Sequence, residues 1–161
     1  MSTIRTIVVP HDFSDFAEAA LDVGIELANA LGADLHLLNV LQPPAYAYGS
    51  ELYAGGPIHN TNEDRLALAR ESKLRLEDVA ERHALPGISI RCHVIDGSRV
   101  AEAIDHEAAR LVADLIVMGT HGRTGLARLL MGSVAQEVVR RADCPVITVR
   151  GPAQHDVADA A

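Results

Sequence analysis

The feature that most constrains the fold is a regular alternation between short apolar runs and longer segments with helical spacing. Strand patterns, either rich in β-branched residues or alternating between apolar and polar, cover residues 4–9, 35–40, 88–94, 115–118 and 146–149. Helical spacing predicts helices over residues 14–31, 63–83, 98–112 and 133–142. Strands that alternate with helices form βαβ units, so we expect an α/β fold with a parallel sheet covered on both faces.

Several helix ends carry recognisable signals. Ser14 is a candidate N-cap and Gly32 a candidate C-cap of the first helix, and Ser98 is a candidate N-cap of the third. The charged second helix places Glu71 four residues before Arg75, a spacing at which opposite charges attract each other. These signals predict where the helices begin and end.

The length of 161 residues suits a single domain of ordinary size. We expect that domain to cover residues 1–150, followed by a flexible tail at 151–161. No internal repeat or second domain is evident. A Pro-, Gly- and Tyr-rich stretch at 42–62 has no clear period, and loops of that length are usually functional or disordered.

Composition excludes several classes of protein. The net charge of −8 argues against sequence-independent nucleic-acid binding, which needs a basic face. No stretch is long and apolar enough for a membrane span, and the charged N-terminal run is too short for a signal peptide. Cys92 and Cys144 lie far apart without CxxC spacing, which favours a reduced protein over a disulfide scaffold. We therefore expect a cytoplasmic protein with no nucleic-acid or membrane partner.

Two loops that follow strands carry unusual residues. In parallel α/β sheets, ligands bind beyond the carboxyl ends of the strands, where the strand order reverses. Pro10, His11 and Asp12 follow the first strand, and the glycine-rich stretch "GTHGRTGLARLLMGSV" at 119–134 follows the fourth. We expect a ligand site at these loops.

The glycine-rich stretch has the parts of a phosphate cradle. Gly119 and Gly122 allow positive φ and close approach of a ligand, and successive N–H groups in such a turn form an anion-binding concavity. Gly132 and Ser133 stand at a predicted helix N-terminus, which favours phosphate. Ser133 is placed either to cap this helix or to donate its hydroxyl to a phosphate oxygen. Glycine content alone leaves open a turn that merely serves tight packing.

The stretch is neither of two common nucleotide motifs. It lacks the lysine of GxxxxGK[ST], so it is not a P-loop, and no GxGxxG follows the first strand. Its spacing of Gly119, Gly122 and Gly132-Ser133 matches instead the G-2x-G-9x-G-[S/T] signature of the ATP-binding branch of the universal stress protein family. The chain resembles this family over nearly its whole length, through "TIVVPHDFSDFAEAAL", "LHLLNV", "ADLIVMGTHGRTGL" and "CPVITVR".

The resemblance implies a fold and a place for the ligand. The family has a five-stranded parallel sheet of order 3-2-1-4-5 between two pairs of helices, a Rossmann-like fold of the adenine nucleotide alpha hydrolase type. This order sets the first and fourth strands side by side at the switch point. The Asp12 and Gly119 loops would then share one crevice.

The resemblance also assigns residues to the nucleoside side of that crevice. Pro10 matches the turn that shapes the pocket, Asp12 the acidic residue near the nucleoside, and Val40 the position whose backbone meets the adenine edge. Asp12 could equally cap the first helix, and Val40 could be an ordinary strand end. His11 departs from the family, which commonly has a small hydroxyl residue there. Its imidazole would stack on or crowd the base, or point to solvent.

The remaining matches lie on the ribose and phosphate sides. Met118 and Gly119 match the ribose side, and the phosphate side is matched by His121, Gly122, Gly132, Ser133 and Val134. Arg123 either screens phosphate charge or is a solvated surface arginine.

The favoured function is a regulatory protein that binds ATP, or AMP or ADP, with Mg²⁺ on the phosphates and slow or absent turnover. The family's usual pairing implies a homodimer through the last strand, Val146 to Val149. The alternatives are an ATP hydrolase or nucleotidyl transferase on the same fold, or a structural dimer with an empty pocket. "HDFS" is not the HxGH signature of a transferase, no catalytic residue is assigned, and the eight histidines show no HxxxH or HExxH metal spacing.

Overall fold

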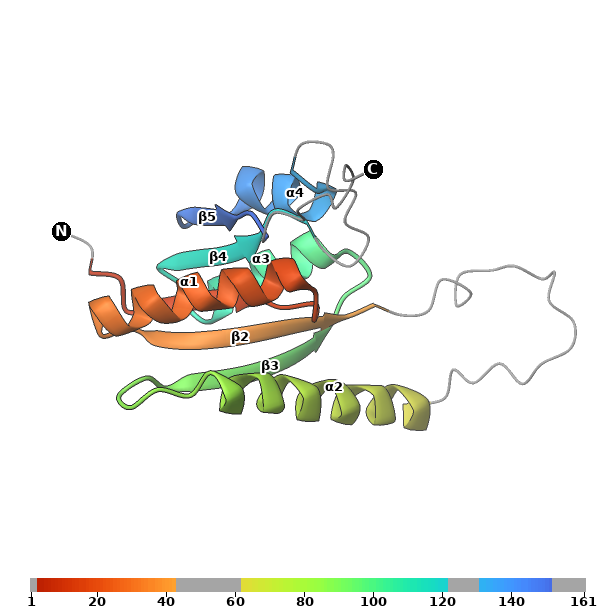
Figure 1. Ribbon diagram of the computed structural model, residues 1–161. Coiled ribbons are helices and arrows are strands. Elements are labelled where there is room, and N and C mark those ends of the chain that lie inside the picture. Colours follow the sequence, from red (N-terminus) through yellow and green to blue (C-terminus); the bar gives the residue numbers. More distant parts are fainter. Residues whose placement is uncertain (1–2, 43–61, 122–130, 152–161) are drawn as a thin grey trace, which may run out of the picture.

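The computed structural model describes residues 3–42, 62–121 and 131–151 (Figure 1). In chain order the elements are β1 (Thr6–Pro10), α1 (Asp15–Leu31), β2 (Asp34–Leu41), α2 (Asn62–Arg82), β3 (Ile90–Asp96), α3 (Val100–Arg110), β4 (Leu115–Gly119), α4 (Ser133–Arg141) and β5 (Val146–Val149). The stretch expected to be a long loop, 42–62, and the expected tail, 151–161, lie outside the described residues except for residues 42, 62 and 151.

The five strands form one parallel sheet of order β3-β2-β1-β4-β5. β1 pairs with β2 from Thr6 opposite Asp34, and with β4 from Ile7 opposite Leu115. The expected fold is therefore confirmed. β1 and β4 are neighbours although β2 and β3 lie between them in sequence, so the strand order reverses between β1 and β4. Ligands in such folds bind beyond the carboxyl ends of these two strands.

Helices cover both faces of the sheet, which explains why the strands read as nearly continuous apolar runs. Alternate residues of β1 show the two faces: Ile7 and Val9 pack with residues of α1 and α2, while Val8 packs with residues of α3 and α4. Figure 1 shows α1 crossing in front of the strands and α3 lying behind them. The two buried clusters make one core on each face of the sheet.

The ends of α1 match the sequence signals, but the start of α3 does not. The Ser14 side chain accepts a hydrogen bond from the Ala17 N–H, and Gly32 ends the helix at φ 65°. Ser98 does not cap α3: Arg99 occupies the N-cap position with extended dihedrals and makes no side-chain cap bond. The hydroxyl of Ser98 therefore lies one residue too early to reach the first free amides of the helix.

Two further features bear on the expectations from composition. Within the ranges that the structure describes, no helix has the length and apolarity needed to cross a membrane. Cys92 and Cys144 are both free thiols, and burial raises the pKa of each above its ordinary value. A raised pKa makes a thiol less reactive at neutral pH.

Candidate functional site

A cavity of about 630 Å³ opens beyond the carboxyl ends of β1, β2 and β4. This volume is in the range of small-molecule sites. The structure describes ten of the twelve site residues expected from the sequence, and all ten line this cavity: Pro10, His11, Asp12, Val40, Met118, Gly119, His121, Gly132, Ser133 and Val134. Gly122 and Arg123 lie outside the described residues. The switch point thus brings together segments separated by more than a hundred residues.

Buried polar contacts fix the loop after β1. The His11 N–H donates to the Leu38 carbonyl at 2.7 Å, and the Asn39 side-chain amide donates to the His11 carbonyl at 2.7 Å. The Ser72 hydroxyl of α2 donates to the Asn39 Oδ1 at 2.7 Å. Because Asn39 and Ser72 are buried, these bonds are shielded from water and tie the loop to both β2 and α2.

Asp12 supports the cap of α1 without being the cap. Its Oδ1 accepts hydrogen bonds from the Ser14 N–H at 3.2 Å and from the Ser14 hydroxyl at 2.6 Å. The Ser14 Oγ in turn accepts from the Ala17 N–H at 3.3 Å. The alternative in which Asp12 caps α1 is therefore wrong. Its carboxylate is held at the cavity, where it can accept hydrogen bonds from a ligand hydroxyl or amine.

His11 does not point to solvent, because only 2% of it is exposed. Its Nδ1 accepts a hydrogen bond from the Phe13 N–H at 3.2 Å. Its Nε2 has no hydrogen-bond partner among the described residues and lies 3.7 Å from the Glu18 carboxylate. Burial is the main cause that lowers the pKa of His11, against the opposing effect of Glu18.

Gly119 is needed for close packing rather than for backbone freedom. In the described part of the chain, only Gly32 and Gly87 among the glycines have positive φ, so the expected positive φ at Gly119 is wrong. A Cβ at Gly119 would lie 2.8 Å from the backbone oxygen of Phe16 in α1. The end of β4 and the first turn of α1 are therefore too close for any side chain at this position.

The start of α4 presents free amides to the cavity. Gly132 holds the N-cap position at φ −59°, and its own N–H donates to the Thr120 carbonyl at 2.7 Å. Ser133 is the first helical residue, so of its two alternatives the one in which it caps the helix is wrong. The first helical bond runs from the Gln136 N–H to the Gly132 carbonyl, which leaves the amides of residues 133–135 without an acceptor inside the helix. Such a terminus favours an anion.

The opposite wall comes from α2, which the sequence reasoning did not assign to the site. Leu68, Glu71, Ser72 and Arg75 line the cavity there. The expected attraction between Glu71 and Arg75 forms no ion pair. The Arg75 guanidinium instead lies 4.0 Å from the centre of the Phe13 ring. Spacing within α2 could not reveal this wall, because its neighbours come from β1 and β2.

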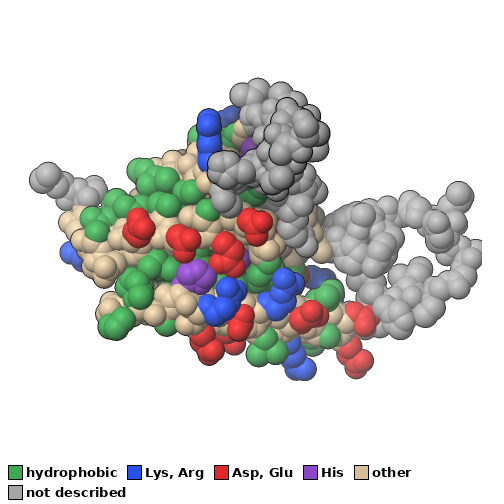
Figure 2. All heavy atoms as spheres, in the orientation of Figure 1, with side chains coloured by type: hydrophobic (Ala, Val, Ile, Leu, Met, Phe, Trp, Pro, Cys, Tyr) green, Lys and Arg blue, Asp and Glu red, His purple; other side chains and the backbone are tan. Residues whose placement is uncertain are grey.

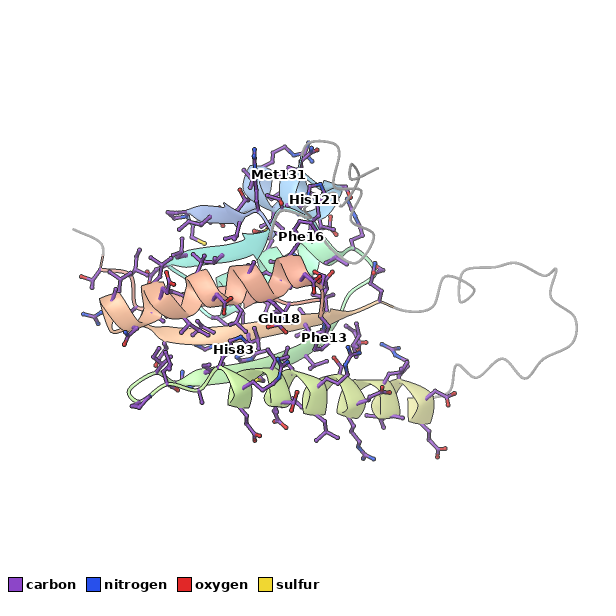
Figure 3. All side chains as sticks on the ribbon, viewed as in Figure 1. Phe13, Phe16, Glu18, His83, His121 and Met131 are labelled. Carbon is purple, nitrogen blue, oxygen red and sulfur yellow. The ribbon has the colours of Figure 1, made fainter. Side chains whose placement is uncertain are left out.

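Aromatic side chains flank both ends of the loop region. Figure 3 shows Phe13 toward α2 and Phe16 near His121. The centres of the Phe16 and His121 rings are 5.3 Å apart. The His121 Nδ1 lies 3.2 Å from the Thr120 hydroxyl. Over the part of the chain that the structure describes, no group of three or more His, Cys, Asp or Glu residues is arranged to hold a metal ion.

Comparisons with known proteins agree with this geometry. The universal stress protein family model matches residues 3–150. A universal stress protein of Thermus aquaticus is 37% identical over 91% of this chain and 98% of its own length. The solved structure of protein MJ0577 of Methanocaldococcus jannaschii is 26% identical, with a TM-score of 0.78 over 94% of this chain and 99% of that one. A universal stress protein solved in complex with cAMP is 27% identical, with a TM-score of 0.59 over 94% of this chain and all of that one. The chain therefore belongs to the universal stress protein family.

Proposed function

We propose that the cavity at the β1/β4 switch point binds an adenine nucleotide. The observation that carries this proposal is the pairing, in one cavity, of a held carboxylate at Asp12 with the free amides at the start of α4. The carboxylate and the end of β2 at Val40 suit a nucleoside, and the amides suit phosphate. The solved relative in complex with cAMP supports the same ligand class.

We propose ATP as the physiological ligand. The amides of Ser133 and Val134 and the Ser133 hydroxyl would hold phosphate oxygens, and Gly122 and Arg123 stay predicted contacts on the same side. Mg²⁺ would be held chiefly by those phosphate oxygens and by water, as it usually is with nucleotides. Occupancy of the site would set a conformation or a partner interaction, with slow or no turnover, in a single domain that spans residues 1–150.

Titration with two nucleotides tests the ligand class. We expect purified protein to bind ATP with Mg²⁺ and to bind NAD at least tenfold more weakly, because the cavity has a phosphate end but the chain has no dinucleotide fingerprint. Isothermal titration calorimetry with ATP, ADP, AMP and NAD measures the order of affinities. NAD binding as tight as ATP binding would contradict the proposal. Mass spectrometry of the nucleotide released by denaturation would identify what the protein carries.

We also propose a homodimer through β5. β5 is an edge strand, and Ile147, at its centre, is 37% exposed. An exposed apolar edge strand is prone to pair with another chain. Antiparallel pairing of two copies of β5 would cover Ile147 and pair the backbone N–H and C=O groups on the outer edge of the strand.

Ile147→Lys should convert the dimer to a monomer at micromolar concentration, because it places two charges close together in the proposed interface. Size-exclusion chromatography with light scattering measures the mass. Leu74→Lys is the matched control, since Leu74 is 67% exposed on α2, which lies against β2 and β3 and away from β5. A monomeric wild-type protein, or equal loss of the dimer in both variants, would contradict this interface.

A further inference from the structure

The imidazole of His11 is a structural part of the cavity. Of the ionisable side chains in the described wall of the cavity, only His11 is buried. Its backbone is fixed by Leu38 and Asn39, and its ring is fixed by the Phe13 N–H, which donates to Nδ1 at 3.2 Å. The ring also meets the Phe13 ring edge-on, with centres 5.4 Å apart.

This hydrogen bond requires a neutral imidazole. A backbone N–H can only donate, so Nδ1 must carry a lone pair and the ring proton must be on Nε2. The proton on Nε2 then faces the Glu18 carboxylate 3.7 Å away. A second proton on Nδ1 would point at the Phe13 N–H and abolish the bond.

The bond holds a strained residue. Phe13 has φ +66°, a left-handed conformation that is unfavourable for a bulky side chain. Such strain persists only where the surroundings impose it. The contact from the His11 side chain to the amide two residues later imitates the turn that Asn and Asp side chains form. Asp12 lies between the two residues, so the same turn sets the direction of its carboxylate.

The charges around His11 do not remove the cost of protonating it. Glu18 lies on α1, but its Oε1 is also 3.5 Å from Arg82 and its Oε2 is 3.5 Å from His83. Figure 2 shows acidic side chains over α1 facing basic and histidine side chains on the α2 side, and Figure 3 shows Glu18 and His83 between the two helices. Burial lowers the pKa of His11 most, Glu18 and Asp12 oppose this, and His83 and Arg82 add to it.

We propose that His11 is a positioning residue whose neutral Nδ1 holds Phe13 in its left-handed conformation and so aims Asp12 into the cavity, which makes ligand binding there depend on the deprotonated imidazole. The inference rests on the proposed nucleotide function. The lowered pKa keeps His11 neutral at pH 7. Binding that requires the neutral ring is complete above the pKa of His11 and is lost as the pH falls below it.

Two substitutions separate acceptor chemistry from packing. His11→Asn keeps an acceptor that can bond the amide two residues later but cannot titrate. His11→Leu removes the acceptor and keeps apolar bulk. Affinity for AMP is measured by calorimetry between pH 5 and 8, with the full-length chain. The ratio of wild-type to His11→Asn affinities cancels the titration of the phosphate, which both measurements share.

That ratio should fall as the pH drops below the pKa of His11 and level off about tenfold lower, because protonation removes the same acceptor that His11→Leu lacks. His11→Asn should bind within about threefold of wild type at pH 8, and His11→Leu should bind up to about tenfold more weakly than His11→Asn at every pH. A ratio that stays constant over the pH range in which His11 titrates, or His11→Leu binding like His11→Asn, would overturn the inference and leave the nucleotide function standing.

A measurement without ligand decides the inference even if no nucleotide binds. The ¹⁵N shifts of the ligand-free protein should show His11 Nδ1 unprotonated at pH 8. The chemical shift of the Phe13 amide should change with pH together with the shifts of the His11 ring. In His11→Asn the chemical shift of the Phe13 amide should stay constant between pH 5 and 8. A protonated Nδ1 at pH 8 would overturn the inference. So would a Phe13 amide chemical shift that stays constant while His11 titrates. Absence of AMP and ATP binding by wild type at every pH would instead overturn the proposed function.

Discussion

Gly132→Val is expected to reduce nucleotide affinity by more than a hundredfold while the protein stays folded. A Cβ at Gly132 would lie 3.1 Å from the Thr120 carbonyl, the group that accepts the Gly132 N–H. The added methyl groups of valine would displace the start of α4 or occupy the approach to its free amides. Hydrogen bonds to a charged phosphate contribute about 1.5–3 kcal/mol each, so losing two of them has this effect.

Calorimetry with ATP measures the loss, and circular dichroism checks the fold. Gly132→Ala is the matched smaller step and should bind with intermediate affinity. Because φ at Gly132 is −59°, a value open to any residue, neither variant should strain the backbone through φ. Asp12→Ala should lose less affinity, and equally for ATP and ADP, because the only ligand contacts it removes are those to the nucleoside. Parental affinity in Gly132→Val would show that the phosphate site lies elsewhere.

Gly119→Ala is expected to destabilise the fold more than any other single methyl group added in the glycine-rich stretch that the structure describes. Its Cβ would lie 2.8 Å from the Phe16 oxygen and 2.9 Å from the Phe16 carbonyl carbon, and backbone atoms cannot rotate away. Overpacking of this kind costs about 2–3 kcal/mol. For a domain of this size we expect the melting temperature to fall by roughly 5–10 °C.

The choice of substituent separates the two explanations for this glycine. If positive φ were required, Gly119→Asn would be better tolerated than Gly119→Ala, because Asn adopts the left-handed conformation more readily. Close approach of α1 predicts the reverse, since Asn is larger. Thermal unfolding followed by circular dichroism ranks the two variants. A higher melting temperature for Gly119→Asn than for Gly119→Ala would support the requirement for positive φ.

The order of elements was predictable because it depends on local patterns. Strand and helix periods, Ser14 before α1 and Gly32 after it are properties of neighbouring residues, and the structure confirms them. The predicted N-cap of α3, Ser98, was wrong for a local reason too, since Arg99 occupies the cap position without a side-chain bond. A serine near a helix start signals a cap only when its backbone stands at the half-helical position.

The site divides in the same way. The loops at 10–12 and 119–134 were identifiable because residue types such as Gly and Asp stand directly after apolar runs. The wall formed by Leu68, Glu71, Ser72 and Arg75 was missed, because nothing within a solvated helix shows which other segment faces it. The prediction that Gly119 has positive φ was wrong for a related reason: the atoms that exclude a side chain there belong to Phe16, about a hundred residues away in sequence.

The sequence by itself determined the α/β architecture, the family and the two loops that form the cavity, because periodicity and motif spacing are written along the chain. Only the tertiary structure decided what each residue does there. It placed the Asp12 carboxylate and the free amides after Gly132 in one cavity, and it buried His11, whose Nδ1 accepts from Phe13. Those roles depend on distances between segments brought together by burial, and burial acts on the folded chain as a whole.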